Sequence, residues 1–352
     1  MEGKSIAIAV IGTGIIGPRH AKSVAECPNA TLLCIVDPSP SARDVAASFD
    51  VPLFASVSEM LQGIRRPDAA IVCTPNSTHV AISKELLEAG IHVLVEKPFS
   101  TTISSGRELV ESAKSSGKHL LVGHHRRFNP YTTATKRALA DGIVGQVIAV
   151  SGLWATYKPP AYFRAPTEWR ATTGSGGPIL INLIHEVDLL QYLLGPITRV
   201  HAEQTLSQRG HEAEEGAAIL LRFASGVVGT FILSDCTPSP YNFEAATGEN
   251  PLFPKAGKDV YRIFGAEGTL SVGDMKVHRY GEGKEKSWTS ELDESTLEVG
   301  DEIPFDEQVK HLVRVVWGEE QPRCTGEDGL RAVVVCDAIK RALIQGGAVD
   351  VE

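Results

Sequence analysis

The sequence predicts two domains: an α/β domain with a doubly wound parallel sheet, then an α+β domain with a large, mostly antiparallel open sheet. Over residues 1–125, short apolar strands alternate with amphipathic helices, which is the pattern of parallel βαβ units. After about residue 125 the apolar segments become longer and alternate apolar with polar residues, as strands with one buried face do. We therefore predict a first domain at 1–125 and a second at 126–352.

The first domain is expected to contain five strands and four helices. Apolar runs predict strands at 5–12, 31–37, 67–75, 92–98 and 118–124. The segments between them predict helices at 17–26, 40–50, 78–90 and 105–117. This order produces a parallel sheet with helices on both faces.

The second domain is expected to be mainly a sheet. Strands are predicted at 146–157, 197–208, 216–226, 227–235, 259–273 and 275–280, with a hairpin turn at Ala224-Ser225-Gly226. One helix at about 178–194 interrupts the strands. A last helix at about 329–346 ends at Gly346-Gly347, and we expect it to pack back on the first domain.

Composition excludes several classes of protein. The 352 residues are 43% hydrophobic and 22% charged, which suits a globular protein. The net charge is −9 without a basic run, which argues against a nucleic-acid partner, and no apolar run approaches the length of a membrane span. The six scattered cysteines lack C-x-x-C spacing, so we predict reduced thiols, no metal site and a cytoplasmic location. The first strand begins too early to leave room for a signal peptide.

A glycine motif predicts a dinucleotide site. Gly12, Gly14 and Gly17 stand in G-x-G-x-x-G register after a strand and at the start of a helix, as a Rossmann fold requires. Asp37 ends the second strand 20 residues after Gly17, where it can accept hydrogen bonds from the ribose hydroxyls. The negative charge of Asp37 favours NAD, whereas NADP is also considered because nearby Arg43 could accommodate its 2′-phosphate. The alternative is a glycine-rich turn with an unrelated aspartate.

A charged pair follows the apolar run of the fourth predicted strand. Glu96, Lys97 and Pro98 come after Val93-Leu94-Val95, at the sheet edge where ligands of open α/β sheets bind. An ammonium there can hydrogen-bond the reacting oxygen or exchange a proton with it, and Pro98 restricts the backbone. Glu96 is expected to pair locally or to contact the nicotinamide ribose. The alternative is a surface Lys-Glu pair.

Taken together, these motifs resemble those of the Gfo/Idh/MocA family (glucose–fructose oxidoreductase, inositol dehydrogenase, rhizopine catabolism). The resemblance includes the stretches at 74–79, 123–130, 168–170 and 176–190 and covers nearly the whole chain. It implies an NAD(P)-dependent oxidoreductase acting on sugars, polyols and related carbonyl compounds. It also implies a homodimer or homotetramer formed through the C-terminal sheet. The cofactor contacts it implies are Gly12, Gly14, Ile15, Ile16, Asp37, Thr74, Pro75, Asn76, His79, Glu96, Lys97 and His125.

The resemblance also implies a catalytic histidine. His185 lies on the predicted helix 178–194 with Asp188 three residues later, on the same helix face. An imidazole suits proton exchange with an alcohol. Many relatives carry an aspartate four residues before this histidine, where this chain has Ile181. We therefore predict Lys97 and His185 as the catalytic pair, with Asn182 as a substrate-binding residue.

Two segments are expected to contact the substrate. The polar and aromatic stretch 155–170 contributes Tyr157, Lys158, Trp169 and Arg170, of which Lys158 or Arg170 suits a carboxylate. Segment 236–258 lacks periodicity, so it is either a binding loop with Tyr241 or Glu244 near the substrate, or an oligomer contact.

The sequence thus predicts hydride transfer between the nicotinamide and a carbon that bears a hydroxyl. The substrate is expected to be a sugar, cyclitol or similar polyhydroxylated or carboxylated small molecule. Two alternatives remain. An enzyme could retain NAD and use transient oxidation for elimination, epimerisation or hydrolysis, or the protein could be a non-catalytic nucleotide sensor.

Overall fold

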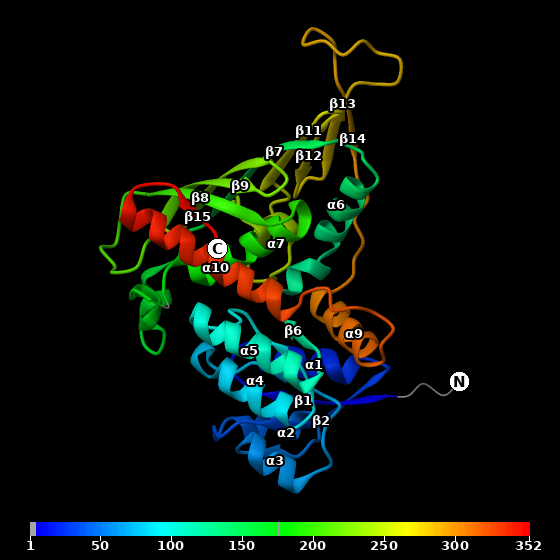
Figure 1. Ribbon diagram of the computed structural model, residues 1–352, viewed down its shortest axis with the longest axis vertical. Coiled ribbons are helices and arrows are strands. Elements are labelled where there is room, and N and C mark those ends of the chain that lie inside the picture. Colours follow the sequence, from blue (N-terminus) through cyan, green and yellow to red (C-terminus); the bar gives the residue numbers. More distant parts are fainter. Residues whose placement is uncertain (1–4, 175) are drawn as a thin grey trace. The chain divides into compact units, whose positions relative to one another are not determined.

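The computed structural model describes residues 5–174 and 176–352, and the chain forms two compact units (Figure 1). The first unit contains the chain up to Phe128 together with Glu302–Val333. The second contains Asn129–Asp301 together with Val334–Glu352. The first unit therefore includes a segment near the C-terminus that the sequence pattern placed in the second domain.

The first unit is built on a parallel sheet of six strands in the order β3-β2-β1-β4-β5-β6. The strands are β1 (Ile6–Ile11), β2 (Ala30–Val36), β3 (Leu53–Phe54), β4 (Ala69–Val72), β5 (His92–Val95) and β6 (Leu120–Val122). All neighbouring pairs are parallel, which confirms the predicted doubly wound sheet. The two-residue β3 was not predicted. β5 ends at Val95, so Glu96, Lys97 and Pro98 follow the strand at its carboxyl end.

Helices cover both faces of this sheet. They are α1 (Gly17–Glu26), α2 (Ala42–Ser48), α3 (Val57–Gly63), α4 (His79–Glu88), α5 (Ile103–Ser116), α9 (Pro304–Val316) and the first residues of α10 (Gly326–Gln345). One core layer includes Met60 and Leu109. The opposite layer joins Val24 of α1 to Val309 and Leu312 of α9. Because α9 buries its apolar side against this face, residues 302–333 cluster with the first unit.

The second unit contains a sheet of nine strands in the order β14-β13-β12-β11-β7-β10-β9-β8-β15. The strands are β7 (Val147–Ala155), β8 (Ile197–Gln204), β9 (Gly216–Phe223), β10 (Val228–Ser234), β11 (Tyr261–Gly265), β12 (Thr269–Val272), β13 (Lys276–Arg279), β14 (Asp293–Thr296) and β15 (Val349–Asp350). The central pair β7 and β10 is parallel and the other pairs are antiparallel, which confirms the predicted sheet. The hairpin turn before β10 is also confirmed, with Gly226 at a φ of 90°. The predicted strand 259–273 is instead two strands, β11 and β12.

The helices of the second unit are α6 (Pro130–Ala140), α7 (Ile184–Leu194), the short α8 (Phe243–Thr247) and the end of α10. The predicted helix 178–194 does not begin as an α-helix. Its first turn, Ile179–Leu183, is a π-helix, and such turns occur often at functional sites. A pattern of apolar residues with a period of 3.6 does not distinguish a π-helical turn from an α-helical one.

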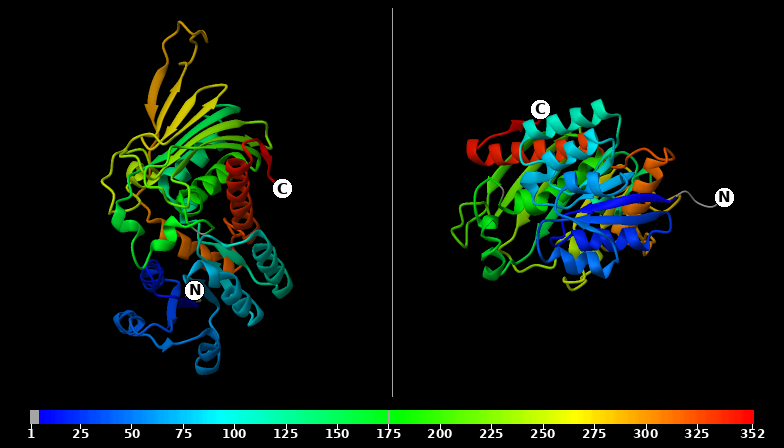
Figure 2. Two further views of the ribbon diagram at one scale, coloured as in Figure 1. Left: turned by 90° about the vertical axis from the view of Figure 1, so that its left-hand side faces the viewer. Right: turned by 90° about the horizontal axis from the view of Figure 1, so that it is seen from below.

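One face of the nine-stranded sheet is open. The helices α7 and α10 lie on one face (Figures 1 and 2). Along β9 every second residue is buried, and those between point the other way and stay exposed. Leu220 and Ile232 on this other face are 53% and 46% exposed. The sheet thus presents apolar side chains to solvent within its own unit.

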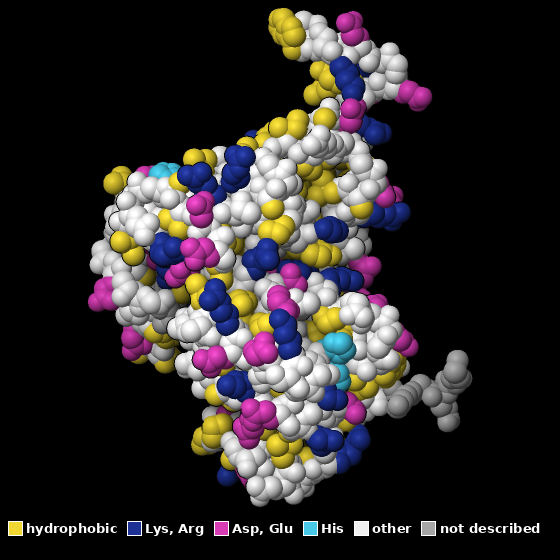
Figure 3. All heavy atoms as spheres, in the orientation of Figure 1, with side chains coloured by type: hydrophobic (Ala, Val, Ile, Leu, Met, Phe, Trp, Pro, Cys, Tyr) yellow, Lys and Arg dark blue, Asp and Glu magenta, His cyan; other side chains and the backbone are white. Residues whose placement is uncertain are grey.

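The surface has no single-sign charge field on the face drawn in Figure 3, where basic and acidic side chains are interspersed. No helix within residues 5–174 and 176–352 has the length and apolar character needed to cross a membrane.

Candidate functional site

The turn between β1 and α1 has space for a phosphate group. Gly12 has a φ of 94°, and a Cβ there would lie 2.8 Å from the carbonyl carbon of Cys73. A Cβ on Gly17 would lie 2.0 Å from the carbonyl oxygen of Gly12, so both positions require glycine. A Cβ on Gly14 would meet no heavy atom within 4 Å. No side chain caps α1 at Ile16, so the N–H of Gly17 remains available to a pyrophosphate, whereas Pro18 has no N–H and that of Arg19 donates to the carbonyl oxygen of Ile16.

Asp37 directly follows β2 and is fixed beside this turn. Its Oδ2 accepts hydrogen bonds from the backbone N (2.6 Å) and Oγ1 (2.7 Å) of Thr13, and its Oδ1 accepts one from the N of Ser39 (2.7 Å). A carboxylate has about four acceptor positions, so capacity remains for ribose hydroxyls. The glycine turn, the open helix end and this carboxylate fit NAD. Sequence reasoning missed Thr13, whose only signal was its place inside the glycine motif.

Several other predicted cofactor residues follow the carboxyl ends of the strands of the first unit's sheet, at the same edge as the glycine turn. Ile15 is 90% exposed beside Gly14. Thr74, Pro75 and Asn76 follow β4, and the last two begin a 3₁₀ turn. All of them follow the carboxyl ends of parallel strands, where ligands of such sheets bind.

His79, another predicted cofactor residue, lies between two backbone segments. It is almost fully buried, with Nε2 2.8 Å from the carbonyl oxygen of Thr74 and Nδ1 2.9 Å from that of Pro98. The ring therefore joins the segment after β4 to the segment after β5. His79 thus links the backbone at Thr74 to the backbone at Pro98, the residue after Lys97.

Glu96 holds the backbone of Lys97. Its Oε1 accepts a hydrogen bond from Nε2 of the buried His20 at 2.7 Å, and its Oε2 accepts one from the N of Lys97 at 3.1 Å. Burial raises the pKa of Glu96, but the hydrogen bond from His20 and attraction to His20, His125 and Lys97 outweigh it and lower the pKa to about 2. Glu96 is thus a buried carboxylate that orients the peptide of the predicted catalytic lysine.

A role for His20 was not predicted from the sequence. Its position on the apolar side of α1, three residues after Gly17, could have indicated a buried polar contact. His20 meets the ring of Phe305 from α9 edge to face, with 5.1 Å between the ring centroids. The predicted cofactor residue His125 stacks on the same ring at 4.4 Å. Phe305 therefore packs against both histidines that lower the pKa of Glu96.

In the second unit, Lys158 and Asn182 are brought together. Lys158 is 8% exposed, and its Nζ donates to Oδ1 of Asn182 at 2.6 Å and lies 3.5 Å from Oδ2 of Asp235. Burial lowers the pKa of Lys158 to about 8; attraction to Asp235 and Glu244 opposes this shift, and repulsion from Arg170 adds to it. This is a lysine that can exchange a proton near neutral pH.

Arg170 adjoins the same group of side chains. Its guanidinium carbon lies 3.9 Å from the ring centroid of Tyr162, and Nζ of Lys158 lies 4.7 Å from that centroid. Trp169 packs near the guanidinium and is partly exposed. Tyr157, by contrast, is half exposed and packs near Arg209. The structure thus brings two predicted substrate residues, Lys158 and Arg170, onto the ring of Tyr162, which was not predicted.

His185 lies in the first turn of α7 and is buried, as is Asp188. The preceding π-helix carries Ile181 and Asn182. Glu214 fixes the start of this helix by accepting a hydrogen bond from the N of Ile179 at 3.0 Å. Sequence reasoning missed Glu214, because nothing in the local pattern connects it with a helix 35 residues earlier.

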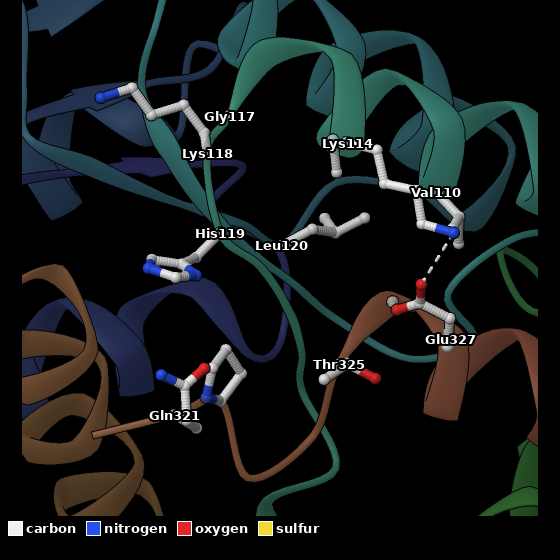
Figure 4. Close-up of a pocket in the computed structure, with 12 residues that line it drawn as sticks. Val110, Lys114, Gly117, Lys118, His119, Leu120, Gln321, Thr325 and Glu327 are labelled. Carbon is white, nitrogen blue, oxygen red and sulfur yellow. Dashed lines mark ion pairs between the residues drawn. The ribbon is translucent and has the colours of Figure 1, made fainter. Parts of the chain in front are cut away.

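A cavity of about 330 Å³ occurs elsewhere in the first unit (Figure 4). Its lining includes Lys118, His119 and Leu120 at the beginning of β6, and Lys114 forms an ion pair with Glu327 (3.1 Å) beside it. The beginnings of parallel strands lie at the edge opposite to the glycine turn, so this cavity is not the nucleotide site. No cluster of His, Cys, Asp or Glu suited to a metal ion occurs in the described part of the chain.

Comparison with known proteins relates this geometry to a family. Residues 6–124 match the Gfo/Idh/MocA oxidoreductase family, NAD-binding Rossmann fold, and residues 136–351 match the C-terminal alpha/beta domain of the same family. The chain is 29% identical over 298 residues to 1,5-anhydro-D-fructose reductase of Ensifer adhaerens, covering 84% of this chain and 83% of that protein. It is 29% identical over 279 residues to scyllo-inositol 2-dehydrogenase (NAD(+)) of Bacillus subtilis, covering 76% and 74%.

The fold also matches a solved structure. The WlbA dehydrogenase from Bordetella pertussis in complex with NADH and UDP-GlcNAcA has a TM-score of 0.78 and 24% identity, with 99% of each chain covered. The two family domains together span most of the sequence, and the glycine turn with Asp37 has the features that an NAD-binding Rossmann fold requires. The chain therefore belongs to the Gfo/Idh/MocA family of NAD-dependent oxidoreductases.

Proposed function

We propose that the protein oxidises or reduces a sugar, cyclitol or related polyhydroxylated or carboxylated small molecule at a carbon that bears a hydroxyl or carbonyl oxygen. The observation that carries the proposal is the open glycine turn beside the fixed carboxylate of Asp37, on a chain that retains Lys97 and His185. Two relatives named for a cyclitol and an anhydro-sugar support this class of substrate.

The first unit is proposed to bind and select the cofactor, which supplies or accepts the hydride. The N–H of Gly17 at the start of α1 donates to the pyrophosphate, and Gly14 leaves room for it. Asp37 accepts hydrogen bonds from the adenosine ribose and repels a 2′-phosphate, so NAD is preferred over NADP.

Lys97 and His185 are proposed to act on the reacting oxygen. The ammonium of Lys97 hydrogen-bonds this oxygen and stabilises negative charge on it. The imidazole of His185 exchanges the proton that leaves or joins the oxygen during turnover. Glu96 contributes by holding the Lys97 peptide, since its Oε2 accepts from the backbone N of that residue.

Measurement of NADH formation with a panel of sugars and cyclitols tests this function. We expect Lys97→Ala and His185→Ala to lose activity by at least about a hundredfold, while fluorescence titration shows nearly unchanged NADH affinity. Lys118→Ala is the matched control, because Lys118 lines the cavity at the opposite edge of the sheet. Full activity of Lys97→Ala would remove this lysine from the reaction. Tight NADH binding without turnover of any panel member would favour an enzyme that retains its cofactor, or a sensor.

The open face of the nine-stranded sheet is proposed to form a homodimer or homotetramer. Its exposed apolar side chains, including Leu220, Val228 and Ile232, support an interface between copies of this chain. A cytoplasmic location is proposed as well. It is supported by the six cysteines, all of which are free thiols.

A further inference from the structure

We propose that the substrate carries a carboxylate, which Arg170 and Asn182 contact directly and for which Lys158 positions Asn182. This inference rests on the proposed function and narrows its substrate class to sugar acids. All three side chains belong to the second unit. Three features support the carboxylate site: the donors of Asn182, the charge of Arg170 and the apolar character of the neighbouring helix turn.

The orientation of the Asn182 amide follows from chemistry. A lysine ammonium can only donate hydrogen bonds, so the amide must turn its Oδ1 toward Nζ of Lys158, 2.6 Å away. The NH₂ group of Asn182 then points elsewhere, and it donates no hydrogen bond within residues 5–174 and 176–352. Asn182 is only half-buried, so a ligand can reach it. The NH₂ group of Asn182 can therefore donate hydrogen bonds to an acceptor on a ligand.

Arg170 adds a positive charge without a matching carboxylate. Its guanidinium stacks on Tyr162 and donates from Nη1 to the carbonyl oxygen of that residue at 3.2 Å. Its Nε is buried and has no hydrogen-bond partner in the described structure. No Asp or Glu within the described residues forms an ion pair with it. A buried donor on a charged group is costly to leave unsatisfied, which favours a bound anion.

The acidic residues nearby are already engaged by other cations. Asp235 pairs with Arg209 through its Oδ1 at 2.6 Å as well as with Lys158. Glu215 accepts hydrogen bonds from the backbone of Gln208 and Arg209. Glu244, which also attracts Lys158, accepts a hydrogen bond from Nε1 of Trp154 at 2.9 Å. These carboxylates thus have partners other than the guanidinium of Arg170.

The adjacent helix turn has no carboxylate to bind a hydroxyl as acceptor. The π-helix presents Ile181, an apolar side chain, next to Asn182. A neutral polyol benefits from acceptors as well as donors, whereas a carboxylate only accepts. The planar guanidinium of Arg170 matches the two oxygens of a carboxylate, and the NH₂ group of Asn182, held by Lys158, is a further donor. The site formed by Arg170 and Asn182 therefore suits a sugar acid better than a neutral sugar.

Calorimetric titration of the full chain, with and without saturating NADH, tests this inference. The probes are D-galacturonate against D-galactose and D-glucuronate against D-glucose, pairs that differ only in a carboxylate. We expect wild type to bind each acid at least about tenfold more tightly than its neutral partner. Arg170→Gln and Asn182→Ala should each weaken acid binding by about tenfold and change neutral-sugar binding by less than about twofold.

Lys158 needs a readout that a merely structural role would not change. Lys158→Met should lose the preference for acids, and Lys158→Arg should restore part of it. Arg199→Gln, at an exposed arginine on β8, is the control and should change nothing. Equal affinity for both members of each pair, absence of acid binding, or equal weakening of both members by the variants would overturn the inference. Because binding is read without turnover, failure of the proposed oxidoreduction stays distinguishable from failure of the carboxylate site.

Discussion

Two alanine substitutions in the same turn should separate cofactor binding from folding. In Gly14→Ala the new Cβ meets no heavy atom within 4 Å, and Gly14 is not among the glycines with positive φ. The folded protein should therefore be unchanged in stability, or more stable by up to about 1 kcal/mol, because alanine restricts the unfolded chain. The methyl group would occupy the space left for the pyrophosphate.

The size of the expected effects follows from these distances. Loss of close approach to one charged group costs about 1.5–3 kcal/mol, so NADH affinity of Gly14→Ala should fall by about 10- to 100-fold. In Gly17→Ala the Cβ would lie 2.0 Å from the carbonyl oxygen of Gly12, which forces the backbone apart. That variant should lose about 1–3 kcal/mol of stability as well as NADH affinity.

Chemical denaturation of the free protein and fluorescence titration with NADH provide the two measurements. The refuting result is specific. If Gly14→Ala binds NADH within about threefold of wild type at unchanged stability, the pyrophosphate does not lie against this turn. If Gly17→Ala is as stable as Gly14→Ala, the close approach of α1 to the turn does not contribute as described.

Three further predictions concern single residues. Asp37→Ala should raise the affinity for NADPH relative to NADH by about tenfold, and an unchanged ratio in paired titrations would remove Asp37 from cofactor selection. Lys158→Met should be more stable than wild type at pH 7 by up to about 3 kcal/mol, because the folded pKa of about 8 lies below the unfolded value of 10.5. The free-energy cost of burying this charge is complete below about pH 8 and vanishes above 10.5. The free energies of unfolding of wild type and Lys158→Met should therefore converge between these pH values. A difference that stays constant with pH would contradict the lowered pKa of Lys158. Leu220→Arg should reduce the molar mass measured by light scattering without loss of thermal stability, since Leu220 is exposed within its own unit; an unchanged mass would place the interface elsewhere.

The cofactor half of the site was largely predictable from sequence. Gly12, Gly14 and Gly17 have fixed roles within one short turn, and Asp37 follows at a distance set by one βαβ unit. Local spacing therefore carries most of the information. Thr13 and His20 escaped notice because their partners, Asp37 and Glu96, come from other strands and a pattern along the chain does not show such pairs.

The substrate half was predictable only as separate residues. Lys158, Arg170 and Asn182 were each expected to contact substrate. The ring of Tyr162 that Lys158 and Arg170 share, and the hydrogen bond from Lys158 to Asn182 across 24 positions, depend on tertiary packing. The π-helical turn at Ile179–Leu183 was also hidden, because its residues are as apolar as those of an ordinary buried helix.

The position of α9 has a consequence for how the protein is made. The apolar face of the first sheet that carries Ile8 and Val10 is closed by Val309 and Leu312, residues that a ribosome adds only after the segment Asn129–Asp301 of the second unit. Until then this face lacks its cover, and the emerging chain exposes aliphatic surface of the kind that leads to aggregation without chaperones. A fragment ending at Phe128 would have the same defect permanently. The nucleotide-binding unit is therefore completed only after the main segment of the second unit has been made.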